Sequence, residues 1–98
     1  MTKWDVYIAD VPFEDIMESK VIPVVIVDDS IVATIDCIKL TSHPPRSGEY
    51  ALKYWKEAGL HKPTTVRLSK VLSLSPTNLK TRIGSLHIVD ILEIEKRL

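Results

Sequence analysis

The chain has 98 residues, a single cysteine, 13 basic and 13 acidic residues, and therefore a formal net charge of zero. Its length predicts one domain over residues 1–98, and its hydrophobic share of 45% is ordinary for a globular protein. The lone Cys37 excludes an internal disulfide and fits a reducing cytoplasm, which is the expected location. No apolar run approaches the roughly 20 residues that span a bilayer, and the first residues lack a signal-peptide pattern, so no membrane partner is expected.

Basic residues are concentrated in the middle of the chain. A chain with zero net charge does not bind nucleic acid through its overall charge, but it can still carry a local basic groove. Many acidic residues lie in the first 30 positions and the last ten. The basic residues between them, where we expect an anionic partner to bind, are Lys39, Arg46, Lys53, Lys56, Lys62, Arg67, Lys70, Lys80 and Arg82.

The first part of the chain predicts three strands. Residues 4–11 alternate between two apolar faces, one with Trp4, Val6 and Ile8 and the other with Tyr7, Ala9 and Val11. The acidic segment 12–20 is expected to be a loop. Residues 22–29 predict a strand buried on both faces, with Pro23 at its start, where no ladder N–H is needed. A tight turn at 28–30 makes the next strand, residues 31–42, antiparallel to it.

The part after residue 42 is less regular. Prolines and a glycine predict a loop over 43–49. Residues 50–60 are ambiguous, because their alternation suits a strand but Gly59 ends a short turn. Residues 64–75 alternate again and predict a strand that bends near Ser69.

The end of the chain predicts a turn, a short extended segment and a helix. The turn covers residues 76–82 and the extended segment residues 83–86. Apolar residues recur at helical spacing in 87–98, with Asp90 near the start and two basic residues near the end. The expected fold is mainly β (α+β): a small closed or half-closed antiparallel barrel with a C-terminal α-helix.

The sequence contains no metal or nucleotide motif, so no cofactor is expected. His43, His61 and His87 are far apart, with no cysteine or carboxylate at ligand spacing. Three glycines in total do not form a phosphate-binding loop. Cys37 lies in an apolar strand and is expected to belong to the core.

Three features of the predicted strands have ordinary structural explanations when each is taken alone. Thr41 and Ser42 end a strand, where their hydroxyls can cap the following turn. Arg67 interrupts an apolar strand, where its stem can lie along the surface. Ile22 is an apolar residue before Pro23. Their order along the chain is what suggests a function.

That order resembles the PemK/MazF-like family of toxin–antitoxin endoribonucleases over nearly the whole chain. The segments that carry the resemblance are WDVYIADVPF, KVIPVVIVDD, IKLTS, AGLHKPTTVRLSKVLSL and IGSLHIVDILEIEKRL. The resemblance implies an SH3-like barrel and a homodimer that holds single-stranded RNA. It also implies a cognate antitoxin peptide as partner, and metal-free cleavage in which the ribose 2′-OH attacks the adjacent phosphate.

The resemblance also implies site residues. Thr41 matches the family threonine that holds the phosphate, and Arg67 matches the arginine of its Val-Arg strand. Ile22 stands where the family has an arginine, and Ser69 stands where some branches have an aspartate. The expected catalytic positions are thus Thr41, Arg67 and Ile22, the last being the place of the missing arginine. The expected substrate-binding residues are Lys20, Ser42, His43, Arg46 and Ser69.

Ile22 leaves two functions open. Loss of a transition-state donor typically costs on the order of a hundredfold in rate, so a weakened ribonuclease is expected. The alternative is a catalytically inactive module of the same fold that binds RNA or an antitoxin-like peptide. A toxin that acts on a protein such as DNA gyrase is disfavoured, because the final EIEKRL has no aromatic residue to insert.

Overall fold

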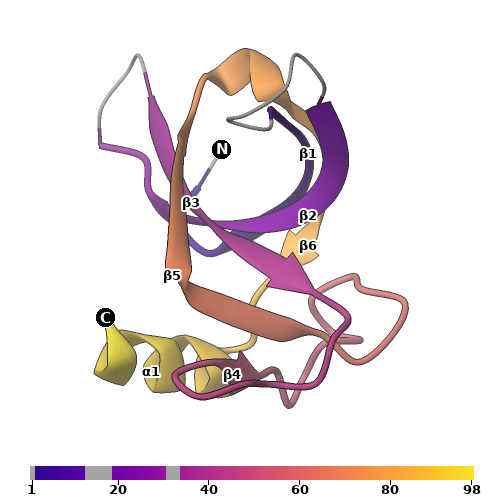
Figure 1. The fold of residues 1–98 in the computed structure, drawn as a ribbon, viewed down its shortest axis with the longest axis vertical. Helices are drawn as coiled ribbons and strands as arrows, with labels where there is room; N and C mark the ends of the chain where they lie inside the picture. The colour runs from indigo at the N-terminus through magenta and orange to yellow at the C-terminus, as the bar shows by residue number, and fades with distance from the viewer. Residues whose placement is uncertain (1, 13–18, 31–33) are drawn as a thin grey trace.

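The computed structural model of the chain describes residues 2–12, 19–30 and 34–98. These residues form a six-stranded antiparallel sheet, one short 3₁₀ helix and one α-helix (Figure 1). The elements are β1 (Asp5–Pro12), β2 (Ser19–Asp28), β3 (Ile35–Thr41), β4 (Tyr50–Ala51), β5 (Thr65–Leu74), η1 (Pro76–Asn78), β6 (Leu79–Ser85) and α1 (Ile88–Arg97). The prediction of a mainly β fold with a C-terminal helix is confirmed. Within the described ranges, no helix is long and apolar enough to cross a membrane.

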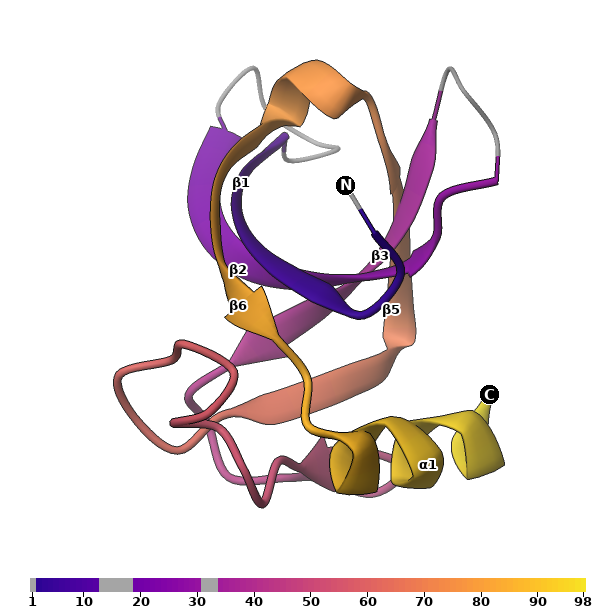
Figure 2. The same cartoon turned by 180° about the vertical axis from the view of Figure 1, so that it is seen from behind.

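The strands follow the order β4-β5-β3-β2-β1-β6 in one strongly curled sheet. Figures 1 and 2 show β1 and β2 curving around an enclosed interior, with α1 beyond the open end of the curl. Over the part of the chain that the structure describes, the edge strands β4 and β6 do not pair with each other. The sheet is therefore the half-closed form of the predicted small barrel.

The side chains of residues 4–11 alternate between two faces, as predicted, and they pack into two separate clusters of the core. Trp4 and Val6 pack in the first cluster, together with Val25, Ile38 and Val66. Tyr7, Ala9 and Val11 pack in the second, together with Val24, Ile26 and Cys37. Successive side chains of a strand point to opposite faces, so β1 contributes to both clusters. Cys37 is fully buried, as expected of a core residue.

The predicted start of the second strand is wrong. β2 begins at Ser19, so Pro23 lies inside the strand, opposite Ile8 of β1. The pairing of β2 with β3 starts only at Val24, opposite Lys39. Pro23 thus occupies a stretch where β2 has one neighbouring strand, a place where a missing N–H is tolerated. Parts of the predicted loop (13–18) and third strand (31–33) lie outside the described residues.

The structure resolves the ambiguous segment 50–60 into two residues of strand and a closed turn. Only Tyr50–Ala51 pair, with β5. Farther on, the Leu60 N–H donates to the Trp55 carbonyl (3.1 Å) and the Gly59 N–H to that of Lys56 (3.0 Å). Gly59 has φ +91°, so these bonds form a Schellman motif that ends one helical turn.

The bend predicted near Ser69 is confirmed. Val71 of β5 pairs with Ile38 of β3, and Val66 pairs with Leu40, so the intervening residues of β5 bulge out of the ladder. In Figure 1, β5 changes direction sharply at this place.

The turn predicted for residues 76–82 is wrong over most of its length. It is the 3₁₀ helix Pro76–Asn78, which Ser75 caps, followed directly by β6. β6 is longer than the predicted extended segment because Leu79–Ser85 pairs along β1. Strand formation here depends on a partner that is distant in the sequence.

Candidate functional site

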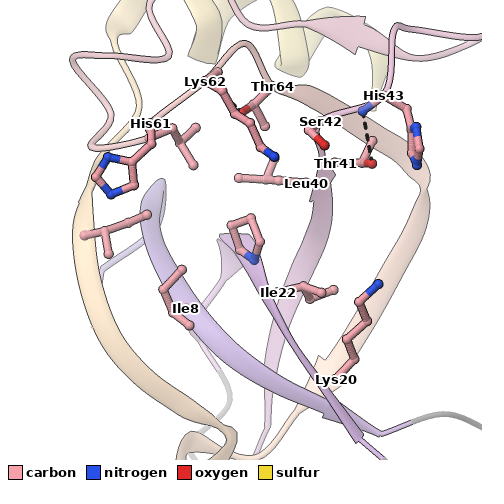
Figure 3. A pocket seen from close by; sticks show the side chains of 13 residues that line it. Ile8, Lys20, Ile22, Leu40, Thr41, Ser42, His43, His61, Lys62 and Thr64 are labelled. Atoms are coloured by element: carbon pink, nitrogen blue, oxygen red, sulfur yellow. Dashed lines mark hydrogen bonds between the residues drawn. The ribbon is translucent and has the colours of Figure 1, made fainter.

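A cavity of about 340 Å³ lies between the start of β2, the end of β3 and the segment before β5 (Figure 3). Its floor is apolar and its rim is polar. The floor residues are Ile8, Ile22, Pro23, Leu40, Leu60 and Ile83, and the rim residues are Lys20, Thr41, Ser42, His43, His61, Lys62 and Thr64. No carboxylate is among these described lining residues, whereas two lysines are, so the rim favours an anionic group.

The end of β3 supplies two of the three hydroxyl-bearing residues of the rim. Thr41 is the last residue of β3 and is half-buried, while Ser42 is exposed. The Thr41 Oγ1 accepts a long hydrogen bond from the His43 N–H (3.4 Å), and the His43 carbonyl accepts one from the Thr65 hydroxyl (2.7 Å). A hydroxyl that accepts from an amide still has its own proton to donate. Thr41 therefore caps the turn and remains able to bind an anion.

The opposite wall is held in place by a close backbone approach. A Cβ on Gly59 would lie 1.9 Å from the Ile83 carbonyl oxygen, and one on Gly84 would lie 2.2 Å from that of Ala58. Only glycines allow the turn at 54–60 to rest directly on β6. This contact brings Leu60 and the two residues after it to the cavity.

The expected site residues did not include three rim residues, His61, Lys62 and Thr64, although Lys62 was among the basic residues expected to meet an anionic partner. Thr64 is buried, and its hydroxyl donates to the Lys62 carbonyl (2.8 Å), which fixes the backbone of the wall. A local signal was present in GLHKP, where a glycine that stops a turn and a proline enclose two basic residues. Nothing in that signal indicates that the segment faces the end of β3.

Ile22 lies in the cavity floor. It is half-buried, pairs with Ala9 of β1, and packs against the second core cluster. Five expected site residues thus share the cavity: Lys20, Ile22, Thr41, Ser42 and His43.

Arg46, Arg67 and Ser69 do not line the cavity. The Arg67 Nε lies 3.2 Å from the Glu49 Oε2, and the other carboxylate oxygen of Glu49 accepts from the Arg46 N–H (2.9 Å). These bonds, first that from the Arg46 amide and then that from Arg67, hold the pKa of Glu49 below its ordinary value. Ser69 is exposed at the bend of β5. In this chain the ion pair between Arg67 and Glu49 therefore holds the 43–49 loop against β5.

The titratable side chains do not form a metal site within the described ranges, where no three His, Cys, Asp or Glu side chains gather. Burial raises the pKa of Cys37 to about 12, so its thiol stays protonated at neutral pH and is not a nucleophile. Histidine is the side chain that most often transfers protons in catalysis, and two of them, His43 and His61, line the cavity.

A family model described as PemK-like, MazF-like toxin of type II toxin–antitoxin system matches residues 2–98. No curated protein sequence matches the chain. Among solved structures, the chain is similar to a mycobacterial endoribonuclease in complex with its cognate antitoxin. That likeness has a TM-score of 0.82 at 16% identity and covers 100% of this chain and 90% of the other.

Two further solved structures show the same fold. One is an endoribonuclease from a mycobacterial species, with a TM-score of 0.79, 16% identity and coverage of 100% and 86%. The other is the Mycobacterium tuberculosis toxin MazF-mt6, with a TM-score of 0.73, 17% identity and coverage of 95% and 90%.

Proposed function

The chain belongs to the family of PemK-like, MazF-like toxins of type II toxin–antitoxin systems, and from that premise we propose that it is an endoribonuclease of single-stranded RNA. The observation that carries the proposal is the cavity. Its rim joins the hydroxyls of Thr41 and Ser42 to the ammonium groups of Lys20 and Lys62, with no carboxylate among the described lining residues. Such a rim suits a phosphodiester, which is an anion that also accepts hydrogen bonds.

The proposed reaction is an internal transesterification. The ribose 2′-oxygen forms a bond to the adjacent phosphorus, and the bond from phosphorus to the 5′-oxygen breaks. The 2′-OH proton passes to a base, and the leaving 5′-oxygen takes up a proton. The products are a 2′,3′-cyclic phosphate and a free 5′-OH. No metal and no cofactor are required.

In this proposal Thr41 and Ser42 donate hydrogen bonds to the phosphate oxygens, on which negative charge increases in the transition state. Lys20 contributes positive charge, and His43, which also lines the cavity, transfers a proton in the proposed reaction. Arg67 lies outside the cavity of its own chain. Its expected catalytic role, and RNA contacts by Arg46 and Ser69, therefore depend on a homodimer that presents them to the RNA.

Ile22 lowers the rate in this proposal. A side chain without a donor or a charge cannot stabilise the pentacoordinate phosphate, and the loss of one such donor costs on the order of a hundredfold. The same residue favours the second candidate, a catalytically inactive module, because Ile22 already has an apolar role in the cavity floor.

The proposed regulator is a flexible, acidic antitoxin peptide laid across the rim in the cytoplasm. Its carboxylates would meet Lys20 on the rim, and an apolar anchor would enter the floor of the cavity. A pull-down from the source cell that yields no tight peptide complex would contradict this part of the proposal.

Incubation of the purified chain with single-stranded RNA tests the function. We expect slow cleavage that leaves 5′-OH ends, which polynucleotide kinase labels without phosphatase treatment, and cleavage about a hundredfold faster for Ile22→Arg. If both proteins are folded and inert, the chain is a binding module instead. If both cut equally fast, residue 22 does not limit the rate.

A further inference from the structure

We propose that Lys62 is a phosphate-binding cation of the cavity. The inference rests on the proposed ribonuclease function and adds to it a substrate-contacting residue outside the expected set. It follows from where the fold places Lys62, which lies on the wall opposite Thr41 and Ser42.

The side chain of Lys62 points into the cavity. In Figure 3 it descends from the segment before β5 toward Leu40 and Ser42, while Lys20 extends from the start of β2 at the other end of the view. The two ammonium groups therefore approach the cavity from different elements. A phosphate bound at the Thr41–Ser42 end of β3 lies within the space that both lysines border.

The backbone of Lys62 is fixed on both sides, so its ammonium group is presented from a defined position. Before it, the Schellman motif and the contact between Gly59 and Ile83 hold the chain against β6. After it, the buried Thr64 donates its hydroxyl to the Lys62 carbonyl (2.8 Å), and the Thr64 carbonyl accepts from the Leu52 N–H (3.0 Å). A charge on a fixed wall loses less entropy on binding than one on a free loop.

The charge of Lys62 is available for a ligand. Over residues 2–12, 19–30 and 34–98, the ion pairs use Glu49, Asp5 and Glu93, and none uses Lys62. Arg67, the expected cation of β5, is by contrast already bound to Glu49. An ammonium group offers three donors and a full charge, which meets the need of a phosphate.

The floor beneath the lysines explains why residue 22 is apolar. Ligand sites typically measure about 300–1,000 Å³, and this cavity of about 340 Å³ is at the small end, which suits one nucleotide. Ile22, Ile8 and Leu40 offer apolar contact to a base, while the lysines and hydroxyls take its phosphate at the rim. In this arrangement the positive charge that meets the phosphate comes from the wall of the cavity and not from its floor.

The test separates phosphate binding from cleavage. The probe is a fluorescent, random-sequence single strand with 2′-deoxyribose throughout, which the chain can bind but cannot cleave by 2′-OH attack. Its affinity is measured from low to physiological salt for wild type, Lys62→Met, Lys62→Arg and the control Lys3→Met. Lys3 is exposed, lies outside the basic middle of the chain and does not line the cavity.

For Lys62→Met we expect affinity about tenfold lower at low salt, and a slope of log affinity against log salt that is smaller by about 0.7, the value for one phosphate contact to a single strand. Lys62→Arg should restore the slope, and Lys3→Met should leave it unchanged. A structural defect would lower affinity without this charge-specific rescue.

Two outcomes would overturn the inference, and they differ from each other. If wild type binds the probe and cleaves RNA while Lys62→Met keeps the full slope, Lys62 does not contact phosphate and the proposed function still stands. If wild type neither binds the probe at low salt nor cleaves RNA, the ribonuclease proposal fails and Lys62 loses its role with it.

Discussion

Tyr50 donates its hydroxyl proton to the Oδ1 of Asp90, 40 residues later, across 2.5 Å. The carboxylate of Asp90 is fully buried and also accepts the backbone N–H groups of Lys53 (3.0 Å) and Tyr54 (2.9 Å). Burial and the bond to Asp90 raise the pKa of Tyr50 above its ordinary value, so the phenol stays a donor. One side chain in the first turn of α1 thereby ties the helix to the segment that leads into the cavity wall.

Replacing Tyr50 by phenylalanine should destabilise the fold by about 2 kcal/mol, because a buried carboxylate loses one of its three donors. Urea unfolding measures the change. Tyr54→Phe is the matched control, since the Tyr54 ring stacks on His87 and its side chain is exposed. We expect the control to stay within about 0.5 kcal/mol of wild type. Equal losses in the two variants would mean that the bond to Asp90 adds nothing.

Two glycines with similar backbone angles should respond differently to alanine. Gly48 has φ +81° and open space around the position of a Cβ, whereas Gly59 has φ +91° and a Cβ there would strike the Ile83 carbonyl. Gly48→Ala should lower the stability of the folded protein by about 1–2 kcal/mol because of the positive φ alone. Gly59→Ala should cost about 3 kcal/mol or more, because backbone must also move. Thermal unfolding compares the two, and similar losses would contradict the close approach of the 54–60 turn to β6.

The bonds to Glu49 should make the stability of the 43–49 loop depend on pH. The pKa of Glu49 lies below its ordinary value of 4.5 in the folded protein, so its contribution is present above about pH 4.5 and is lost as the pH falls through the folded pKa. The stability difference between wild type and Glu49→Gln, measured by urea unfolding at several pH values, should therefore be largest near neutrality and shrink in acid. Glu95→Gln, at an exposed position of α1, should show no such trend. A difference for Glu49→Gln that stays constant in acid would contradict the role of its charge.

Local sequence patterns predicted the strands whose side chains alternate between two faces. They missed the strand residues that depend on pairing with a strand far away in the sequence. The two-residue period of β1 gave the correct faces, because both faces of that strand are buried. Ser19–Val21 and Leu79–Arg82 have no such pattern and become strand by pairing with β1 on its two sides. Because their side chains are exposed or half-exposed, these residues show no hydrophobic pattern in the sequence.

The candidate site was predictable where it lies on strands. Ile22 and Thr41 lie on neighbouring strands, so the predicted antiparallel order already brought them together, whereas Lys20 was expected in the loop 12–20. Lys62 was not predictable, since its position depends on the packing of two glycines against carbonyl groups far away in the sequence. Arg67 was expected to act in the site, but the partner that holds it in this chain, Glu49, lies on a loop whose path no periodic pattern describes.

The hydroxyl of Thr41 should matter for cleavage much more than for folding. Its hydrogen bond from the His43 N–H is long (3.4 Å), so Thr41→Val, which keeps the shape and removes the hydroxyl, should change stability by less than about 1 kcal/mol. In the proposed reaction the same change removes a donor to the phosphate and should slow RNA cleavage by on the order of a hundredfold. Thr41→Ser restores a hydroxyl and should recover most of the rate. Single-turnover cleavage at saturating enzyme measures the chemical step apart from binding. If Thr41→Val cuts RNA as fast as wild type while Thr41→Ser does not exceed it, the threonine only caps the turn, and the phosphate is held by the lysines alone.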